Sequence, residues 1–229
     1  MSNTRTILNY LQELQENNDR EWYHAHKEER KEAEAAFESF LEDLIVEISK
    51  FDASIPLLDP HTLTFKMVRD TRFSHDVSPY LPAFRAHIAA KGKLPIPVGY
   101  YIVIKPHQET MISGGLFADM FQDATMRIRN YLNEHGAAFD AILSDPQFAS
   151  YFQLKGTKLK NVPRGYDKNH PYGDYLKHKS WYIEYALSDD LVKNDMKFLQ
   201  KSAELCEIIK PFNDFLNTAL VGFEMPKRQ

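Results

Sequence analysis

Hydrophobic residues recur every three or four positions near both ends of the chain, which is the spacing of amphipathic helices. The pattern predicts helices over residues 4–16, 20–51 and 195–220. The last of these contains Pro211, which cannot donate a helical hydrogen bond, so we expect a kink there. Each helix carries an apolar stripe that must be buried against another element.

Between these helices the chain changes to the alternating pattern of β-strands and then back to helical spacing. Strands are predicted over residues 62–68, 84–90, 99–105, 110–113 and 180–187, with a hairpin over 98–114. Further helices are predicted over 119–135, ending before Gly136, and over 137–143, with a loop region over 151–172. The connections between the first strands are too short for a helical crossover, so antiparallel pairing is expected.

The order of these elements predicts an α+β fold. We expect a central, mostly antiparallel sheet with the long N-terminal and C-terminal helices packed on one face, because a sheet face of this kind can bury both apolar stripes. No long linker and no internal repeat divides the 229 residues. Residues 1–229 are therefore predicted to form one domain.

Composition excludes several classes of protein. Hydrophobic residues make up 43% of the chain and charged residues 26%, which is ordinary for a globular protein and not for a disordered one. No apolar run reaches the roughly 18 residues of a membrane helix, and the N-terminal residues lack the unbroken apolar core of a signal peptide. Cys206 is the only cysteine, so no intrachain disulfide is possible and a reducing, cytoplasmic location is expected.

The net charge of −4 conceals an uneven distribution along the chain. Residues 1–50 carry twelve acidic and six basic side chains, whereas residues 150–182 carry seven basic and two acidic ones. Such a division has two interpretations: the basic stretch binds an anionic ligand, or the two regions form faces that attract each other.

Polar and charged side chains gather directly after the predicted strand 62–68. They are Arg69, Asp70, Arg72, Ser74, Asp76 and Tyr80. Arginine offers a fork of N–H donors that suits a carboxylate or a phosphate, and an aspartate can orient the arginine or accept a proton. The cluster is a candidate ligand-binding site. The alternative is an Arg–Asp network that pins a loop to the edge of the sheet.

A second cluster mixes basic and aromatic side chains in the loop region and beyond it. Its candidate ligand-binding residues are Arg164, Tyr166, Lys177 and Lys179, and it includes His170. Charge combined with stacking is typical of a site for a nucleotide or sugar phosphate. Histidine exchanges protons near neutral pH, so His170 is the candidate catalytic acid–base, with Asp76 as its possible partner. The alternative is a solvated loop whose tyrosines pack inward.

We expect the two clusters to meet in one cleft, with Arg69, Arg72 and Asp76 facing Arg164, Tyr166, His170 and Lys179. No metal site is predicted, because the histidines and acids near residue 170 match no zinc or two-metal spacing. No cofactor can be named, since the chain lacks a P-loop and the GxGxxG, HExxH and CxxC motifs.

Several of these stretches resemble domain-of-unknown-function family 2461, a bacterial and fungal family without an assigned activity. They are NNDREWYHAHKEE (17–29), RDTRFSHDVSPY (69–80), GYYIVI (99–104), SGGLF (113–117), VPRGYDKNHP (162–171) and PFNDFLNTA (211–219). The pattern RD-x-RFS-x-DK-x-PYK of that family is matched except at its two lysines, where this chain has Val77 and Leu81. The resemblance covers nearly the whole chain and implies one compact domain, without implying a catalytic residue.

Three functions are consistent with the sequence. The leading hypothesis is a cytoplasmic enzyme or binding protein for a small phosphorylated or carboxylated ligand, with the arginines as an anion clamp. The second is a nucleic-acid-associated module that uses residues 150–182, although an acidic chain lacks the overall basic footprint of duplex binders. The third is a protein–protein adaptor built on the charged first half of the helix 20–51. No membrane association is expected, and the oligomeric state cannot be predicted.

Overall fold

The computed structural model describes residues 3–70, 72, 75–117 and 121–226. Its longer helices are α1 (Thr4–Glu16), α3 (Lys27–Ser49), α5 (Gln122–Ser144) and α9 (Asp195–Ala219). The shorter ones are α2 (Arg20–Ala25), α4 (Pro60–Leu63), α6 (Pro146–Tyr151), α7 (Gly173–Leu176) and α8 (Asp189–Val192). The strands are β1 (Phe84–Ile88), β2 (Tyr100–Ile104), β3 (Thr110–Leu116) and β4 (Trp181–Leu187).

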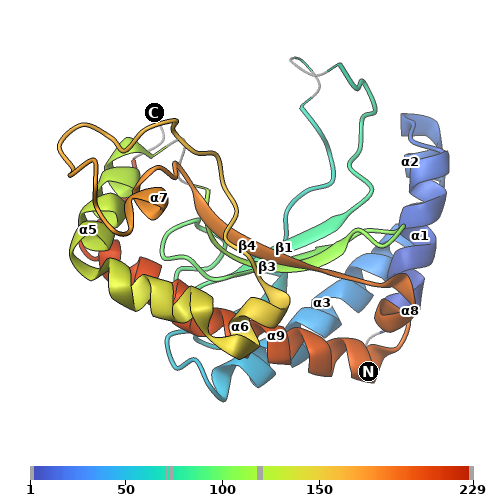
Figure 1. Cartoon of the computed structure of the whole chain (residues 1–229). Coiled ribbons are helices and arrows are strands. Elements are labelled where there is room, and N and C mark those ends of the chain that lie inside the picture. The colour runs from blue at the N-terminus through green and yellow to red at the C-terminus, as the bar shows by residue number, and fades with distance from the viewer. Residues whose placement is uncertain (1–2, 71, 73–74, 118–120, 227–229) are drawn as a thin grey trace.

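The four strands form one sheet in the order β1-β2-β3-β4, and every neighbouring pair is antiparallel. Helices α3 and α9 cover one face of this sheet (Figure 1). Their apolar stripes are buried there, including Phe40 of α3 against Phe198 of α9, whose ring centroids are 4.5 Å apart. The α+β class, the antiparallel sheet and the packing of the long helices on one face are therefore confirmed.

The opposite face of the sheet carries no helix layer (Figure 1). Side chains alternate between the two faces of a strand, and the strand register places His87, Tyr101, Ser113 and Glu184 in one row across all four strands. Gly114, one residue from this row, faces the other way, against Ile209 and Asn213 of α9. The row therefore lies on the open face.

Two asparagines of α9 bind backbone groups at the open end of the β2–β3 hairpin, on the face of the sheet that α9 covers. The side chain of Asn213 accepts a hydrogen bond from Gly115 N (2.9 Å) and donates one to Gly99 O (2.9 Å). One turn later, Asn217 accepts from Val98 N (2.8 Å) and donates to Val98 O (3.0 Å). These bonds satisfy backbone groups that the sheet itself leaves unpaired.

Two predicted elements near the N-terminus are wrong. The single helix 20–51 is interrupted at His26, whose backbone leaves the helical region (φ −98°, ψ 40°) while its ring stacks on Trp22 at 4.0 Å. The strand 62–68 is not formed: Pro60 begins the short helix α4, capped by Asp59. Only Thr64 and Val68 then make isolated bridges, to Ala86 and Tyr80. Proline at the first helical position and an acidic cap favour a helix start over a strand.

One predicted helix end also differs. Helix α5 continues through Gly136 to Ser144, and His135 alone departs from helical angles within it (φ −121°, ψ 23°). Gly136 is buried under the ring of Tyr172, so its missing side chain serves helix packing and does not end the helix. Helix α9 runs over Asp195–Ala219 with Pro211 inside it, which confirms the predicted helix 195–220 to within one residue.

No helix in the described ranges is both long enough and apolar enough to cross a membrane.

Candidate functional site

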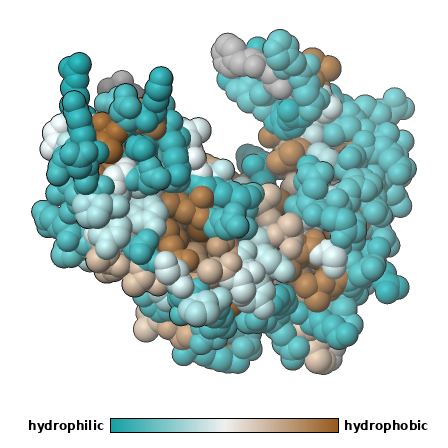
Figure 2. All heavy atoms as spheres, in the orientation of Figure 1, coloured by the Kyte–Doolittle hydropathy of each residue, from teal (hydrophilic) through white to brown (hydrophobic). Residues whose placement is uncertain are grey.

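Two segments rise on either side of the open sheet face and leave a cleft between them. One is the arm, residues 64–70, 72 and 75–81, which is joined across its base by Arg69 N→Pro79 O (2.9 Å) and Leu81 N→Met67 O (2.8 Å). The other is the basic segment, residues 155–179. Both stand on the same side of the sheet (Figure 1), and Figure 2 shows the surface hollowed between them. The sheet forms the floor of this cleft.

The floor of the cleft holds a cavity of about 510 Å³. It is lined by Phe65, His87, Lys93, Pro95, Tyr101, Ser113, Gly114, Gly115, Leu116 and Phe117. Three aromatic rings, Phe65, Tyr101 and Phe117, line it, and the exposed Phe117 stacks on Tyr182 at 4.2 Å. Burial lowers the pKa of His87 to about 4, so its ring is neutral at pH 7. The cavity therefore offers apolar and stacking surface, neutral polar groups and one lysine, Lys93.

Two cations lie beside the ring of Phe65: Lys93, which also lines the cavity, and Arg85. The guanidinium of Arg85 lies 5.7 Å from the ring centroid of Phe65, and the Lys93 ammonium lies 6.0 Å from it. Each has a backbone acceptor: Arg85 donates to Lys66 O (3.0 Å) and Lys93 to Thr64 O (3.2 Å). Among the residues that the structure describes, no carboxylate pairs with either cation, and the buried Nε of Arg85 has no hydrogen-bond acceptor.

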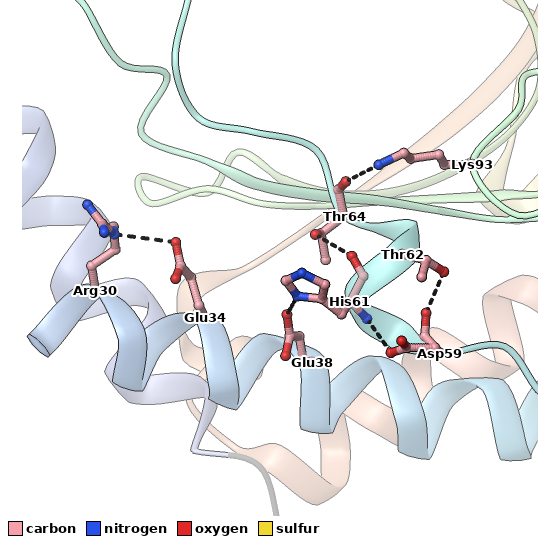
Figure 3. Close-up of polar contacts among 8 residues, drawn as sticks. All are labelled: Arg30, Glu34, Glu38, Asp59, His61, Thr62, Thr64 and Lys93. Atoms are coloured by element: carbon pink, nitrogen blue, oxygen red, sulfur yellow. Dashed lines mark hydrogen bonds and ion pairs between the residues drawn. The ribbon is translucent and has the colours of Figure 1, made fainter. Parts of the chain in front are cut away.

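A second cavity, of about 340 Å³, adjoins the first, because Phe65 and Lys93 line both. It lies between α3 and residues 61–68. Figure 3 shows Glu38 of α3 directed at His61, and Glu34, one turn earlier, paired with Arg30. Glu38 accepts a hydrogen bond from His61 Nδ1 at 2.7 Å, which raises the pKa of His61. Burial raises the pKa of Glu34, although Arg30 lies 3.4 Å away. A carboxylate and an imidazole in contact can exchange a proton with a bound molecule.

The predicted residues of the arm are engaged with one another. Arg69 pairs with Asp76, and Arg72 pairs with Asp70 at 2.6 Å. Asp76 also accepts from Ser78 N (2.9 Å), and the bonds from Ser78 and Arg69 hold its pKa well below the usual range, so it is no proton donor at neutral pH. The remaining two candidates lie apart: Tyr80 is buried at the base of the arm, and Ser74 lies outside the described residues.

Tyr80 anchors the arm to the N-terminal helices. Its ring stacks on Tyr23 of α2 with centroids 3.8 Å apart. Asn18 accepts from Tyr80 N (3.1 Å) and donates to Tyr80 O (2.9 Å). These contacts hold the base of the arm against α2 and Asn18.

The predicted residues of the basic segment bond mainly to α5 and to one another. Tyr166 donates to the Asn130 side chain at 2.7 Å, and His170 Nε2 lies 3.1 Å from Asn133 O. The other nitrogen of His170 accepts from Tyr172 N at 3.1 Å, which leaves Nε2 as the donor. Lys177 pairs with Asp174 at 2.7 Å, whereas the side chains of Arg164 and Lys179 are exposed. Both ring nitrogens of His170 thus have structural partners.

The two predicted clusters belong to the arm and to the basic segment, one on each side of the cleft (Figure 1). Within the described ranges, Asp76 and His170 each bond inside their own wall, so the structure does not bring this predicted acid–base pair together. The residues between the walls, above all Arg85, Lys93 and Tyr101, were missed by the sequence analysis. The alternation in 84–90 and 99–105 places Arg85 and Tyr101 on one face of the sheet, but it cannot indicate that this face stays uncovered.

Comparison with protein families matches residues 6–215 to a family described as "Conserved hypothetical protein (DUF2461)". Neither the curated proteins nor the solved structures contain a significant match.

Proposed function

The chain belongs to this family of conserved hypothetical proteins, and we propose that it binds a small ligand that joins a phosphate or carboxylate to an aromatic group. The site is the cavity on the open sheet face. The observation that carries this proposal is that two cations, Arg85 and Lys93, both lie beside the ring of Phe65, which with Lys93 lines an aromatic cavity.

The dimensions and chemistry of the cavity support such a ligand. Its volume of about 510 Å³ lies within the roughly 300–1,000 Å³ of small-molecule sites. The rings of Tyr101 and Phe117 offer surface on which a planar group can stack. An anion between Arg85 and Lys93 gains charge-assisted hydrogen bonds, which are about twice as strong as neutral ones.

The arm arginines are less suited to this role than the sequence suggested. Arg69 is paired with Asp76, and Arg72 with Asp70, so an incoming anion would compete with these carboxylates for the N–H donors of the arginines. Arg85 and Lys93 donate only to backbone carbonyls in the described contacts, and a carbonyl carries no full charge to displace.

Thermal unfolding with matched probes tests this proposal. Phenyl phosphate and benzoate carry the anion and the ring together, whereas inorganic phosphate carries the anion and benzyl alcohol carries the ring. We expect phenyl phosphate to raise Tm in a saturable manner and the two partial probes to raise it much less. Lys93→Gln should raise about tenfold the concentration of phenyl phosphate that gives half of the maximal rise in Tm. Lys210→Gln, which removes a lysine paired with Asp214 on α9, should leave that concentration unchanged.

The site would be refuted if phenyl phosphate and inorganic phosphate raised Tm equally. It would also be refuted if Lys93→Gln and Lys210→Gln changed the response to phenyl phosphate equally. Salt-sensitive retardation of an oligonucleotide in a gel, together with no response to phenyl phosphate, would instead favour a nucleic-acid-associated module.

A second candidate function is acid–base catalysis on the bound ligand. The specific observation is that Lys93 and Phe65 line both cavities, so a ligand held at Lys93 lies beside the Glu38–His61 pair. NMR spectra of phenyl phosphate, incubated with the protein, would reveal turnover. His61→Ala should then abolish turnover and leave the thermal shift intact, whereas an unchanged ligand would leave binding as the function.

A further inference from the structure

The basic segment forms a closed loop with a defined base. Two backbone bonds join its ends: Leu159 N→Lys177 O (2.8 Å) and Lys179 N→Thr157 O (2.9 Å). Lys158 also bridges to His178, and Lys155 to Tyr182 of β4. The loop therefore leaves the sheet and returns to it along a two-stranded neck.

Contacts at several points hold the loop in shape. Val162 packs against Gly173, where a Cβ would lie 3.1 Å from the Val162 methyl group. The hydrogen bonds from Tyr166 to Asn130 and from His170 to Asn133 fasten the loop to α5. Lysines carried by a loop held this way have fixed backbone positions, so a ligand would not have to order the backbone on binding.

Three lysines of this loop line a cavity of about 350 Å³. Lys160, Lys168 and Lys177 surround it, with Asn161 and Val162 completing the lining. Lys177 pairs with the exposed Asp174. In the described ranges no carboxylate pairs with Lys160 or Lys168. The other acid of the loop, Asp167, accepts from Asn169 N (2.9 Å) in a local turn. Three lysines thus line one hollow, and only Lys177 of the three has a carboxylate partner among the described residues.

We propose that this hollow is a second anion site, separate from the open-face cavity, and that it binds a compact, multiply charged phosphate such as pyrophosphate. An anion there would relieve repulsion among the lysines and gain several charge-assisted bonds at once. The Asn161 amide can donate a further bond. A small anion fits better than a long nucleic acid, because the lysines line one hollow and the first 50 residues of the chain carry twelve acidic side chains against six basic ones.

Isothermal titration with inorganic pyrophosphate at low salt tests the proposal. The double variant Lys160→Gln/Lys168→Gln removes two of the three cations. Its matched control is Lys193→Gln/Lys197→Gln, which makes the same change in net charge outside the loop. We expect saturable binding that weakens at least tenfold in the first variant and less than twofold in the second. Lys93→Gln should leave pyrophosphate binding intact, which separates this site from the open-face cavity.

Three results would overturn the proposal. The first is no saturable binding of pyrophosphate by the unmodified protein. The second is equal weakening in both double variants, which would mean that only the overall charge matters. The third is tighter binding of a single-stranded oligonucleotide than of pyrophosphate, lost in the first double variant, which would assign the lysines to nucleic acid. Circular dichroism of each variant at the titration temperature establishes that it is folded.

Discussion

Replacing Asn213 by alanine should destabilise the protein more than its small change in volume suggests. The amide side chain is buried and joins α9 to two places in the sheet, Gly115 N and Gly99 O, each at 2.9 Å. Alanine can neither accept the first bond nor donate the second. The backbone N–H of Gly115 and the carbonyl of Gly99 would then be left beneath the sheet without a partner from this helix.

The expected magnitude follows from those two groups. A buried polar group that loses its partner costs about 1–3 kcal/mol. The bond to Gly115 is only partly buried, so water can offset some of its loss, and the sum is about 2–4 kcal/mol. For a chain of this length each kcal/mol lowers Tm by about 2–4 °C, which gives a decrease of roughly 5–15 °C.

Urea denaturation followed by circular dichroism measures the free energy of unfolding, and Asn169→Ala is the control, because Asn169 is an exposed loop residue of the same type. Asn213→Asp is a sharper variant. It keeps an acceptor for Gly115 N but places a buried carboxylate against the Gly99 carbonyl, so it should cost at least as much as alanine at neutral pH. A loss below about 1 kcal/mol for Asn213→Ala, indistinguishable from the control, would refute the role of Asn213 in joining α9 to the sheet.

Three further predictions follow from single residues. The free energy of unfolding should decrease as the pH is lowered from about 6.5 to about 4, because the pKa of His87 is lowered to about 4 in the fold and the unfolded chain therefore binds the proton at a higher pH. Denaturation at several pH values should show a smaller decrease for His87→Gln. Parallel curves for the variant and the unmodified protein would contradict the assignment. Arg72→Ala should leave the free energy of unfolding close to that of the unmodified protein, because the pair with Asp70 is exposed and screened by solvent; a loss in chemical denaturation as large as that of Asn213→Ala would contradict this. Gly136→Ala would place a methyl group 2.5 Å from the Tyr172 ring. It should therefore weaken the packing of the basic segment on α5 and increase the rate of tryptic cleavage after Lys168. An unchanged rate of digestion would show that the ring can move aside.

The fold followed from the sequence because its signals are local. The three- and four-residue spacing of apolar positions places the buried stripes of α3 and α9, and short connections force the hairpin to pair antiparallel. The predicted helix and strand pattern went wrong where two local signals compete. Pro60 with its Asp59 cap starts a helix inside an apparent strand, and Gly136 resembles a helix end until Tyr172 packs over it.

The sequence by itself determined the two charged stretches and the side of the sheet on which each open-face residue would lie. Only the tertiary structure decided that this face stays open, and that Arg85 and Lys93 meet around Phe65 while the arm arginines pair with their own aspartates. The physical reason is range. Periodicity and caps act over a few residues, whereas Phe65, Arg85 and Lys93 come together only through the folding of the chain between them, and electrostatic pairing depends on distances that no spacing in sequence specifies.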